Sequence, residues 1–238
     1  MMKTALKYMA IITLVLAAFA PSATVQAVEA SSSVANAQRI MTKFGIPAGP
    51  VDGLSGAQTS RGLCIFRYMA GLSVTRNNLD STTYTYLKNY DAKYSSISKI
   101  PARSSSEYLV AHETCQAMTY ASGGYYKRIM AISTGVSGHG TPNGSYSLGY
   151  TQKGWACSTL YPESCRKHTE GKFAYISNYG NMYNIRQVTG PIYVHGSTEV
   201  PTYPASHGCI RVTVSDSDWM YANVGNGARP TITVTGAY

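Results

Sequence analysis

Ser206-His207-Gly208-Cys209-Ile210-Arg211, which follows Tyr193-Val194-His195-Gly196-Ser197 after a short loop, is the stretch that decides the fold of this chain. The apolar run Pro191–Val194 predicts a strand whose tip carries His195. In an extended segment, residues two apart project to the same side, as His207 and Cys209 would. The two segments therefore predict strand ends that carry a cysteine close to histidines.

These residue types suit nucleophilic catalysis. A cysteine thiol is mostly protonated at neutral pH and must lose its proton before it attacks a carbonyl carbon. A neighbouring imidazole, here that of His195 or His207, can accept that proton. Gly208 lets the backbone approach a substrate closely, and the N–H groups around Gly208 and Cys209 can donate to an oxyanion. Arg211 can bind a substrate carboxylate through two hydrogen bonds.

The same residues also fit less specific interpretations. A lone cysteine is often a buried small apolar side chain, and a histidine at a strand end often has only a structural role. A Cys–His cluster can also bind zinc, which usually takes four nitrogen or sulfur ligands at recognisable spacing. No CxxC or HxxxH pattern accompanies Cys209, so no metal site is predicted. From spacing alone, a nucleophile and a structural cysteine remain equally good interpretations.

Outward from this stretch, the second half of the chain predicts short strands. Runs rich in Tyr, Val, Ile and Thr alternate with glycine-containing turns, and a hairpin is expected across Gly123-Gly124. One helix is expected near Ser215, because Ser215 and Asp218 resemble a capping box. Short strands without long helices between them indicate an all-β or mainly β domain. The predicted strands are Tyr108–Val110, Ala117–Ala121, Lys127–Ser133, Ser145–Leu148, Phe173–Ser177, Ile192–His195 and Thr231–Val234.

The motifs of this half resemble those of a known family. Ser206–Arg211, with His195-Gly196-Ser197 before it, is similar to the signature of L,D-transpeptidases of the YkuD family. Ile132–Gly135, followed by Gly138–Tyr146, resembles the family's STG…TPxGxY segment. These separated motifs occur in the family's order, and the resemblance covers most of residues 107–236. It implies that the catalytic domain is a β-sandwich of mixed sheets.

The resemblance also implies a role for each motif residue. Cys209 would be the acylated nucleophile, and His195 would be the base, oriented by the backbone carbonyl of Gly196. The oxyanion site and the substrate contacts would come from Ser206, His207, Gly208 and Arg211. The spacer between His195 and Ser206 is shorter than the family's commonest pattern and resembles that of a short-loop subgroup. Neither a metal nor an organic cofactor is implied.

The implied reaction takes place on the peptide stems of bacterial peptidoglycan. Cys209 would attack the amide between the third stem residue and the terminal D-alanine of a tetrapeptide, so that D-alanine leaves and a thioester acyl-enzyme remains. A side-chain amine of a neighbouring stem would then form a 3→3 cross-link. Carbapenems typically block such enzymes by acylating the cysteine. Water as acceptor would make the protein an L,D-carboxypeptidase. Two further alternatives are a catalytically silent wall-binding protein and a thiol-redox protein, which would need a second reactive cysteine.

The first half of the chain predicts a small helical unit. Apolar residues at helical spacing predict helices over Val34–Phe44 and Gln58–Met69. Gly49–Gly56 between them resembles the GPVDGxxG turn of three-helix peptidoglycan-binding domains. As an alternative, this unit is a spacer that does not bind glycan. The predicted organisation is a peptidoglycan-binding-like domain at 31–80, a linker at 81–106 and the catalytic domain at 107–238.

The N-terminus predicts export. Lys3 and Lys7 precede an apolar run from Met9 to Ala20, and small-residue cleavage sites follow, so residues 1–27 are expected to be a signal peptide. The apolar run is shorter than the roughly 20 residues that a membrane-spanning helix needs. A secreted, wall-associated protein that is free of the membrane after cleavage is therefore expected.

Cysteine count and charge agree with that compartment. Five cysteines in an exported chain predict disulfides and one unpaired thiol, expected at Cys209. Cys157 and Cys165 are close enough in sequence for a local bridge, and Cys64 would pair with Cys115 by elimination, although sequence alone does not fix connectivity. The net charge of +9 favours an anionic partner such as a bacterial wall. Nucleic acid is not expected, because the basic residues form no run.

Overall fold

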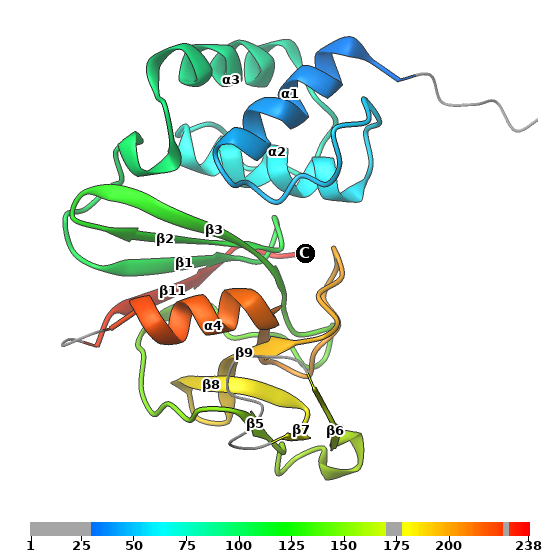
Figure 1. Cartoon of the computed structure of the whole chain (residues 1–238), viewed down its shortest axis with the longest axis vertical. Coiled ribbons are helices and arrows are strands. Elements are labelled where there is room, and N and C mark those ends of the chain that lie inside the picture. The colour runs from blue at the N-terminus through cyan, green and yellow to red at the C-terminus, as the bar shows by residue number, and fades with distance from the viewer. Residues whose placement is uncertain (1–29, 170–177, 226–228) are drawn as a thin grey trace, which may run out of the picture.

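The computed structural model describes residues 30–169, 178–225 and 229–238. Figure 1 shows three helices from the first part of this region stacked at one end of the molecule, on a β domain that supplies the rest. The predicted signal peptide 1–27 and the predicted strand Phe173–Ser177 lie outside the described residues.

The helical unit consists of α1 (Ser32–Lys43), α2 (Ala57–Met69) and α3 (Ser81–Lys93). The first two agree with the predicted helices to within two residues. A linker is expected over residues 81–106, but α3 occupies the first half of this segment, so that prediction is wrong there. Asp80 caps α3 by accepting from the N–H of Thr83 at 2.7 Å, and Leu87 is fully buried. The remainder of the segment contains the short 3₁₀ helix η1 (Ile97–Lys99).

The turn between α1 and α2 is held by one buried amide. The side chain of Gln38 accepts from the N–H groups of Asp52 and Gly53 and donates to Oδ1 of Asp52 and Oγ1 of Thr59. Gly53 has φ +75°, which a residue with a side chain rarely adopts. The glycine-rich Gly49–Gly56 turn therefore has one fixed shape.

A single nine-stranded sheet forms the β domain, in the order β4-β11-β1-β2-β3-β10-β9-β8-β5. Two pairs, β1 with β11 and β9 with β10, are parallel, and the other pairs are antiparallel. The strands are β1 (Tyr108–His112), β2 (Ala117–Ser122), β3 (Tyr125–Ser133), β4 (Gly144–Ser147), β5 (Trp155–Ala156), β8 (Met182–Thr189), β9 (Ile192–Ser197), β10 (Ile210–Thr213) and β11 (Thr231–Thr235). A separate small pair joins β6 (Arg166–Lys167) to β7 (Tyr179–Gly180), and η2 (Pro162–Ser164) precedes it.

The sheet curls on itself, so its two halves enclose one apolar core. Leu109 and Met118 from one half share a buried cluster with Val194 and Val212 from the other. The helix α4 (Val214–Asn223) adds Met220 to this cluster. The expected mainly β fold with a sandwich-like catalytic domain is therefore confirmed. The N-cap of α4 is Thr213, which accepts from the N–H of Asp216 at 3.0 Å, rather than the predicted Ser215.

The predicted strands in the described residues all form, within three residues at each end. Gly123 and Gly124 turn the hairpin between β2 and β3 with φ +62° and +81°, as the sequence predicts. The sequence did not predict β8, which lies between β9 and the edge strand β5 and lacks a simple alternation of buried and exposed residues.

The helical unit and the sheet share a second apolar core. Ile65 and Phe66 of α2 belong to the same buried cluster as Ala117 of β2 and Ile129 of β3. Figure 1 shows α2 as the helix next to these strands. A disulfide between Cys64 and Cys115 crosses this boundary, and a second one joins Cys157 to Cys165, so both expected pairings are present. Cys209 is a free thiol.

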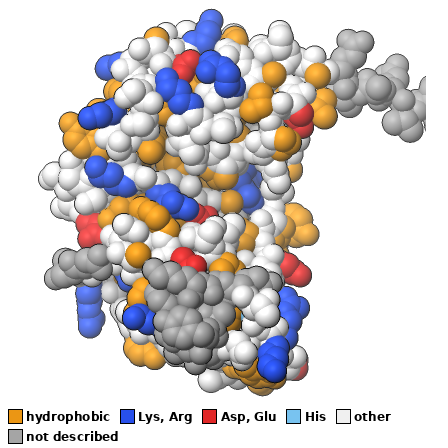
Figure 2. Space-filling view, viewed as in Figure 1, with side chains coloured by type: hydrophobic (Ala, Val, Ile, Leu, Met, Phe, Trp, Pro, Cys, Tyr) orange, Lys and Arg blue, Asp and Glu red, His pale blue; other side chains and the backbone are white. Residues whose placement is uncertain are grey.

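On the face shown in Figure 2, Lys and Arg side chains are spread over the helical unit and the β domain alike. This agrees with the absence of a basic run in the sequence. None of the helices within the described ranges combines the length and the hydropathy that a membrane crossing requires.

Candidate active site

The parallel pairing of β9 and β10 brings the two signature segments together. His195 is opposite Arg211 in the register, and Cys209 lies immediately before β10. Residues two apart in an extended chain face the same side, and so do direct partners in a ladder. Cys209, Arg211 and His195 therefore lie on one face of the sheet, and all three line the same cavity of about 310 Å³.

The His195 side chain is held as a neutral imidazole. It is 5% exposed, and its Nδ1 lies 3.0 Å from the backbone oxygen of Gly196. A carbonyl oxygen only accepts, so Nδ1 carries the proton and Nε2 keeps its lone pair. Burial lowers the pKa of His195 to about 4, a hydrogen bond to Gly196 opposes this shift, and the charge of Arg211 adds to it. At neutral pH this histidine can accept a proton at Nε2.

Cys209 is a partly buried thiol. Burial raises its pKa above the ordinary value, while a backbone hydrogen bond with Tyr193 and the charge of Arg211 lower it. Its Sγ lies 3.8 Å from the backbone oxygen of Pro191, within reach of a weak S–H···O contact. The resting pair is therefore a thiol and a neutral imidazole, rather than a thiolate and an imidazolium.

The turn before Cys209 is fixed by the hydroxyl of Ser206. Oγ of Ser206 donates to the carbonyl of Cys209 at 2.5 Å and accepts from the N–H of Gly208 at 3.1 Å. The hydroxyl of Thr141 donates to the carbonyl of Gly208 at 2.8 Å. Gly208 has φ +114°, and a Cβ there would lie 2.7 Å from Cδ1 of Ile192. The backbone conformation therefore favours glycine at 208, and a larger residue would also displace the Ile192 side chain.

One expected oxyanion donor is already engaged. The N–H of Gly208 donates to Ser206, so it holds the turn and does not point freely into the cavity. The ring of His207 packs against other aromatic rings, with centroids 4.2 Å from Tyr161 and 5.1 Å from His139. His207 thus contributes a wall of the cavity.

A roof over the cavity comes from residues 155–168, which the sequence did not single out as part of the site. Tyr161 lies on His207, and its carbonyl accepts from the side-chain amide of Asn181 at 3.1 Å. Trp155 stacks on His168 at 3.5 Å between ring centroids. The Cys157–Cys165 disulfide closes this segment into a loop. Only the cysteine spacing hinted at such a loop, since its aromatic residues resemble ordinary packing residues in a tyrosine-rich chain.

Among the residues that the structure describes, no three or more His, Cys, Asp or Glu side chains gather closely enough to hold an ion.

Residues 106–234 match the family model of the L,D-transpeptidase catalytic domain, YkuD, which is more than half of the chain. No curated protein matches the sequence. The L,D-transpeptidase from Xylanimonas cellulosilytica is 24% identical, with a TM-score of 0.54 over 87% of this chain and 94% of that chain. The L,D-transpeptidase from Stackebrandtia nassauensis is 15% identical, with a TM-score of 0.45 over 92% of this chain and 98% of that one.

At 24% identity and a TM-score of 0.54, the Xylanimonas structure supports the fold and nothing more. The family match is independent of this structure, and it contains both signature segments. This chain belongs to the L,D-transpeptidase family whose catalytic domain is the YkuD domain.

Proposed function

We propose that this protein is a secreted transpeptidase that cross-links peptidoglycan stems through an acyl thioester on Cys209. The observation that carries the proposal is the free thiol of Cys209 facing one cavity with the buried, neutral imidazole of His195. The proposed partners are stem peptides and, for the helical unit, glycan. The net charge of +9 supports an anionic wall as the surrounding surface.

Acylation begins when Sγ of Cys209 attacks the carbonyl carbon between the third stem residue and the terminal D-alanine. The thiol proton passes to Nε2 of His195, whose Nδ1 remains bonded to Gly196. The carbonyl oxygen becomes an oxyanion, for which the amides of His207 and Cys209 are the proposed donors, since that of Gly208 is engaged. The C–N bond then breaks, and D-alanine leaves with the proton from His195.

Deacylation reverses the roles of these groups. The side-chain amine of a second stem attacks the thioester carbon and gives a proton to His195. The C–S bond breaks, Cys209 recovers a proton, and a 3→3 cross-link remains. Arg211 lines the cavity beside Cys209 and is the proposed contact for a substrate carboxylate.

The neutral resting pair fits this sequence of steps. A buried imidazolium would cost free energy before substrate arrives, because burial disfavours the charged form. With thiol and imidazole both neutral, charge forms only during attack, when the oxyanion compensates it. This explains why a cysteine with a raised pKa can still serve as the nucleophile.

Intact-mass spectrometry tests the proposal. Wild-type protein, incubated with a carbapenem, should gain one drug-sized adduct, and Cys209→Ala should gain none. A disaccharide-tetrapeptide donor should then lose D-alanine and form a cross-linked dimer. Loss of D-alanine without a dimer would identify an L,D-carboxypeptidase. Folded, reduced wild type that forms no adduct and leaves the donor intact would contradict an enzymatic role and favour a wall-binding protein.

A further inference from the structure

We infer that the helical unit positions the turn that carries the nucleophile. Arg61, Arg76 and the Cys64–Cys115 disulfide make the connection. The inference rests on the proposed role of Cys209 and concerns what holds it in place. It gives residues of the first domain a part in the rate of the reaction, independent of any binding of glycan.

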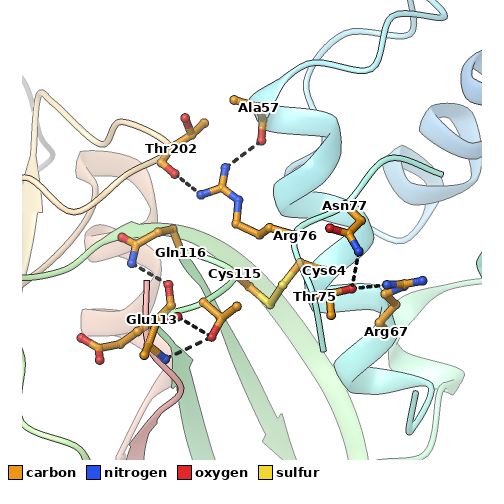
Figure 3. The surroundings of a disulfide bond; sticks show 12 residues. Ala57, Cys64, Arg67, Thr75, Arg76, Asn77, Glu113, Cys115, Gln116 and Thr202 are labelled. Atoms are coloured by element: carbon orange, nitrogen blue, oxygen red, sulfur yellow. Dashed lines mark hydrogen bonds between the residues drawn. A yellow bond between two sulfur atoms is a disulfide. The ribbon is translucent and has the colours of Figure 1, made fainter. Parts of the chain in front are cut away.

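The first connection runs through two arginines. Nη2 of Arg61, on α2, donates to the carbonyl of Pro201 at 2.5 Å, and Nη1 of Arg76 donates to that of Thr202 at 2.5 Å. Figure 3 shows the guanidinium of Arg76 between Thr202 and Ala57, whose carbonyl it also binds, at 3.1 Å. The loop between His195 and Ser206 is therefore tied to the helical unit by two consecutive backbone carbonyls.

The second connection runs through the disulfide. Cys64 of α2 is bonded to Cys115, and the next residue, Gln116, is fully buried with φ +50°. The side-chain amide of Gln116 binds Thr134 twice. Its oxygen accepts from the N–H of Thr134 at 2.9 Å, and its nitrogen donates to Oγ1 at 2.8 Å. A crosslink to the first domain thus fixes the residue that orients Thr134.

Thr134 in turn holds the nucleophile turn. Its carbonyl accepts from the N–H groups of both Ala205 and Ser206, each at 3.0 Å. Ser206 then fixes the backbone of Gly208 and Cys209 through its hydroxyl. One continuous set of contacts therefore runs from the disulfide between the domains to the backbone of Cys209.

The state of Arg61 argues for a role beyond stability. It is 4% exposed, and burial together with the charge of Arg76 lowers its pKa to about 10. Its Nη2 donates to the carbonyls of Pro201 and Ile132, and its Nε is buried without a partner in the described residues. An apolar side chain would usually stabilise such a place better than a charge. A geometric role for the guanidinium explains why a cation stands there.

Small displacements of a nucleophile have large effects on rate. A shift of about 1 Å can lower the rate by roughly 100-fold, because attack needs close and aligned atoms. Arg61 and Arg76 do not reach the cavity, so they are positioning residues and not catalytic ones.

The experiment compares Arg76→Ala and Arg76→Lys with Arg103→Ala in the full mature chain. Arg103 also donates to a carbonyl across the domain boundary, that of Tyr68 at 3.2 Å, but it has no contact with the nucleophile loop. The readouts are the maximal rate of Cys209 acylation by a carbapenem, the concentration that gives half that rate, and hydrogen exchange of the Ala205 and Ser206 amides.

We expect Arg76→Ala to lower the maximal acylation rate at least tenfold, with the half-saturating concentration within twofold of wild type. Exchange of the Ala205 and Ser206 amides should accelerate. Arg76→Lys, which keeps one donor for Thr202, should recover part of the rate, and Arg103→Ala should stay within twofold of wild type. Equal effects of Arg76→Ala and Arg103→Ala would overturn the inference, since they would reveal general loosening.

The exchange measurement keeps this test separate from that of the proposed function. If wild type is not acylated, the proposed function fails, but faster exchange at Ala205 and Ser206 in Arg76→Ala alone would still support the positioning. If wild type is acylated and Arg76→Ala reacts and exchanges as wild type does, the inference fails and the proposed function stands.

Discussion

His195 and Arg211 are direct partners in the parallel register of β9 and β10, so a permanent cation lies next to the imidazole. This charge contributes to the low pKa of His195 and opposes the raised pKa of Cys209. The charge of Arg211 therefore lowers the pKa of both His195 and Cys209, the proposed catalytic pair.

Removing that charge should slow the reaction of Cys209 with an alkylating agent. Because the pKa of Cys209 is raised by burial, the rate with iodoacetamide should be low at pH 7 and rise with pH beyond about 8.5, the usual pKa of a thiol. Arg211→Gln should shift this profile to higher pH, since the thiolate loses a nearby cation. Arg166→Gln, at the roof of the cavity, is the control. A wild-type midpoint at or below pH 7 would contradict a neutral resting pair.

His195 should make the fold sensitive to mild acid. Its pKa is about 4 in the folded protein and about 6.5 when unfolded, so between these values only the unfolded chain binds the proton. The free energy of unfolding should therefore fall as pH drops from 6.5 to 4, by up to roughly 3 kcal/mol. Urea titrations of His195→Gln should show a smaller fall than wild type. Burial also lowers the pKa of His112. The variant His112→Gln therefore gives the pH dependence of the free energy of unfolding when a different buried histidine is removed. Parallel pH curves for wild type and His195→Gln would refute the assignment.

Gly208→Ala should damage both stability and activity. A side chain at φ +114° costs about 1–3 kcal/mol, and the new Cβ would collide with Cδ1 of Ile192. Adding Ile192→Val removes the colliding atom but leaves the backbone strain. The double variant should recover only part of the lost stability in thermal unfolding, and its acylation rate should remain at least tenfold below that of Ile192→Val alone. Full recovery would mean that contact, and not backbone conformation, requires glycine.

The two disulfides should contribute unequally to stability. Chain entropy predicts about 4 kcal/mol for Cys64–Cys115, whose sequence separation is 51, and about 2.5 kcal/mol for Cys157–Cys165, whose separation is 8. Paired Cys→Ala variants, compared by denaturant unfolding, should follow this order. Removal of Cys157–Cys165 should affect substrate binding more than stability, because that bridge closes the roof of the cavity. The reverse order of stabilities would contradict the chain-entropy argument.

Local signals explain which parts could be predicted from the sequence. The hairpin between β2 and β3 follows from β-branched and aromatic runs around Gly123-Gly124. The expected pairing of His195 with Cys209 rests on the resemblance of their two motifs to the family signature, because spacing alone leaves a structural cysteine equally plausible. The hairpin depends on residues that are adjacent in the chain, where spacing carries information, whereas the site is recognised from the order of its motifs.

The features that escaped prediction depend on tertiary contacts. The inner face of α3 is formed by Leu87 with the tyrosines Tyr84 and Tyr90, which do not give a clear apolar stripe. The bonds from Gln116 to Thr134 join residues 18 apart in sequence, and no local pattern marks such a pair. The contacts that support the candidate site therefore could not be predicted, although His195 and Cys209 could be singled out from the sequence.

The burial of Cys209 has a consequence for the two disulfides of the folded protein. A chain with two disulfides and one spare thiol is exposed to shuffling, because a thiolate can attack an existing S–S bond and exchange partners. A raised pKa keeps the spare sulfur protonated at neutral pH and so slows that attack. In the folded protein, burial of Cys209 therefore slows exchange between its thiol and the two disulfides.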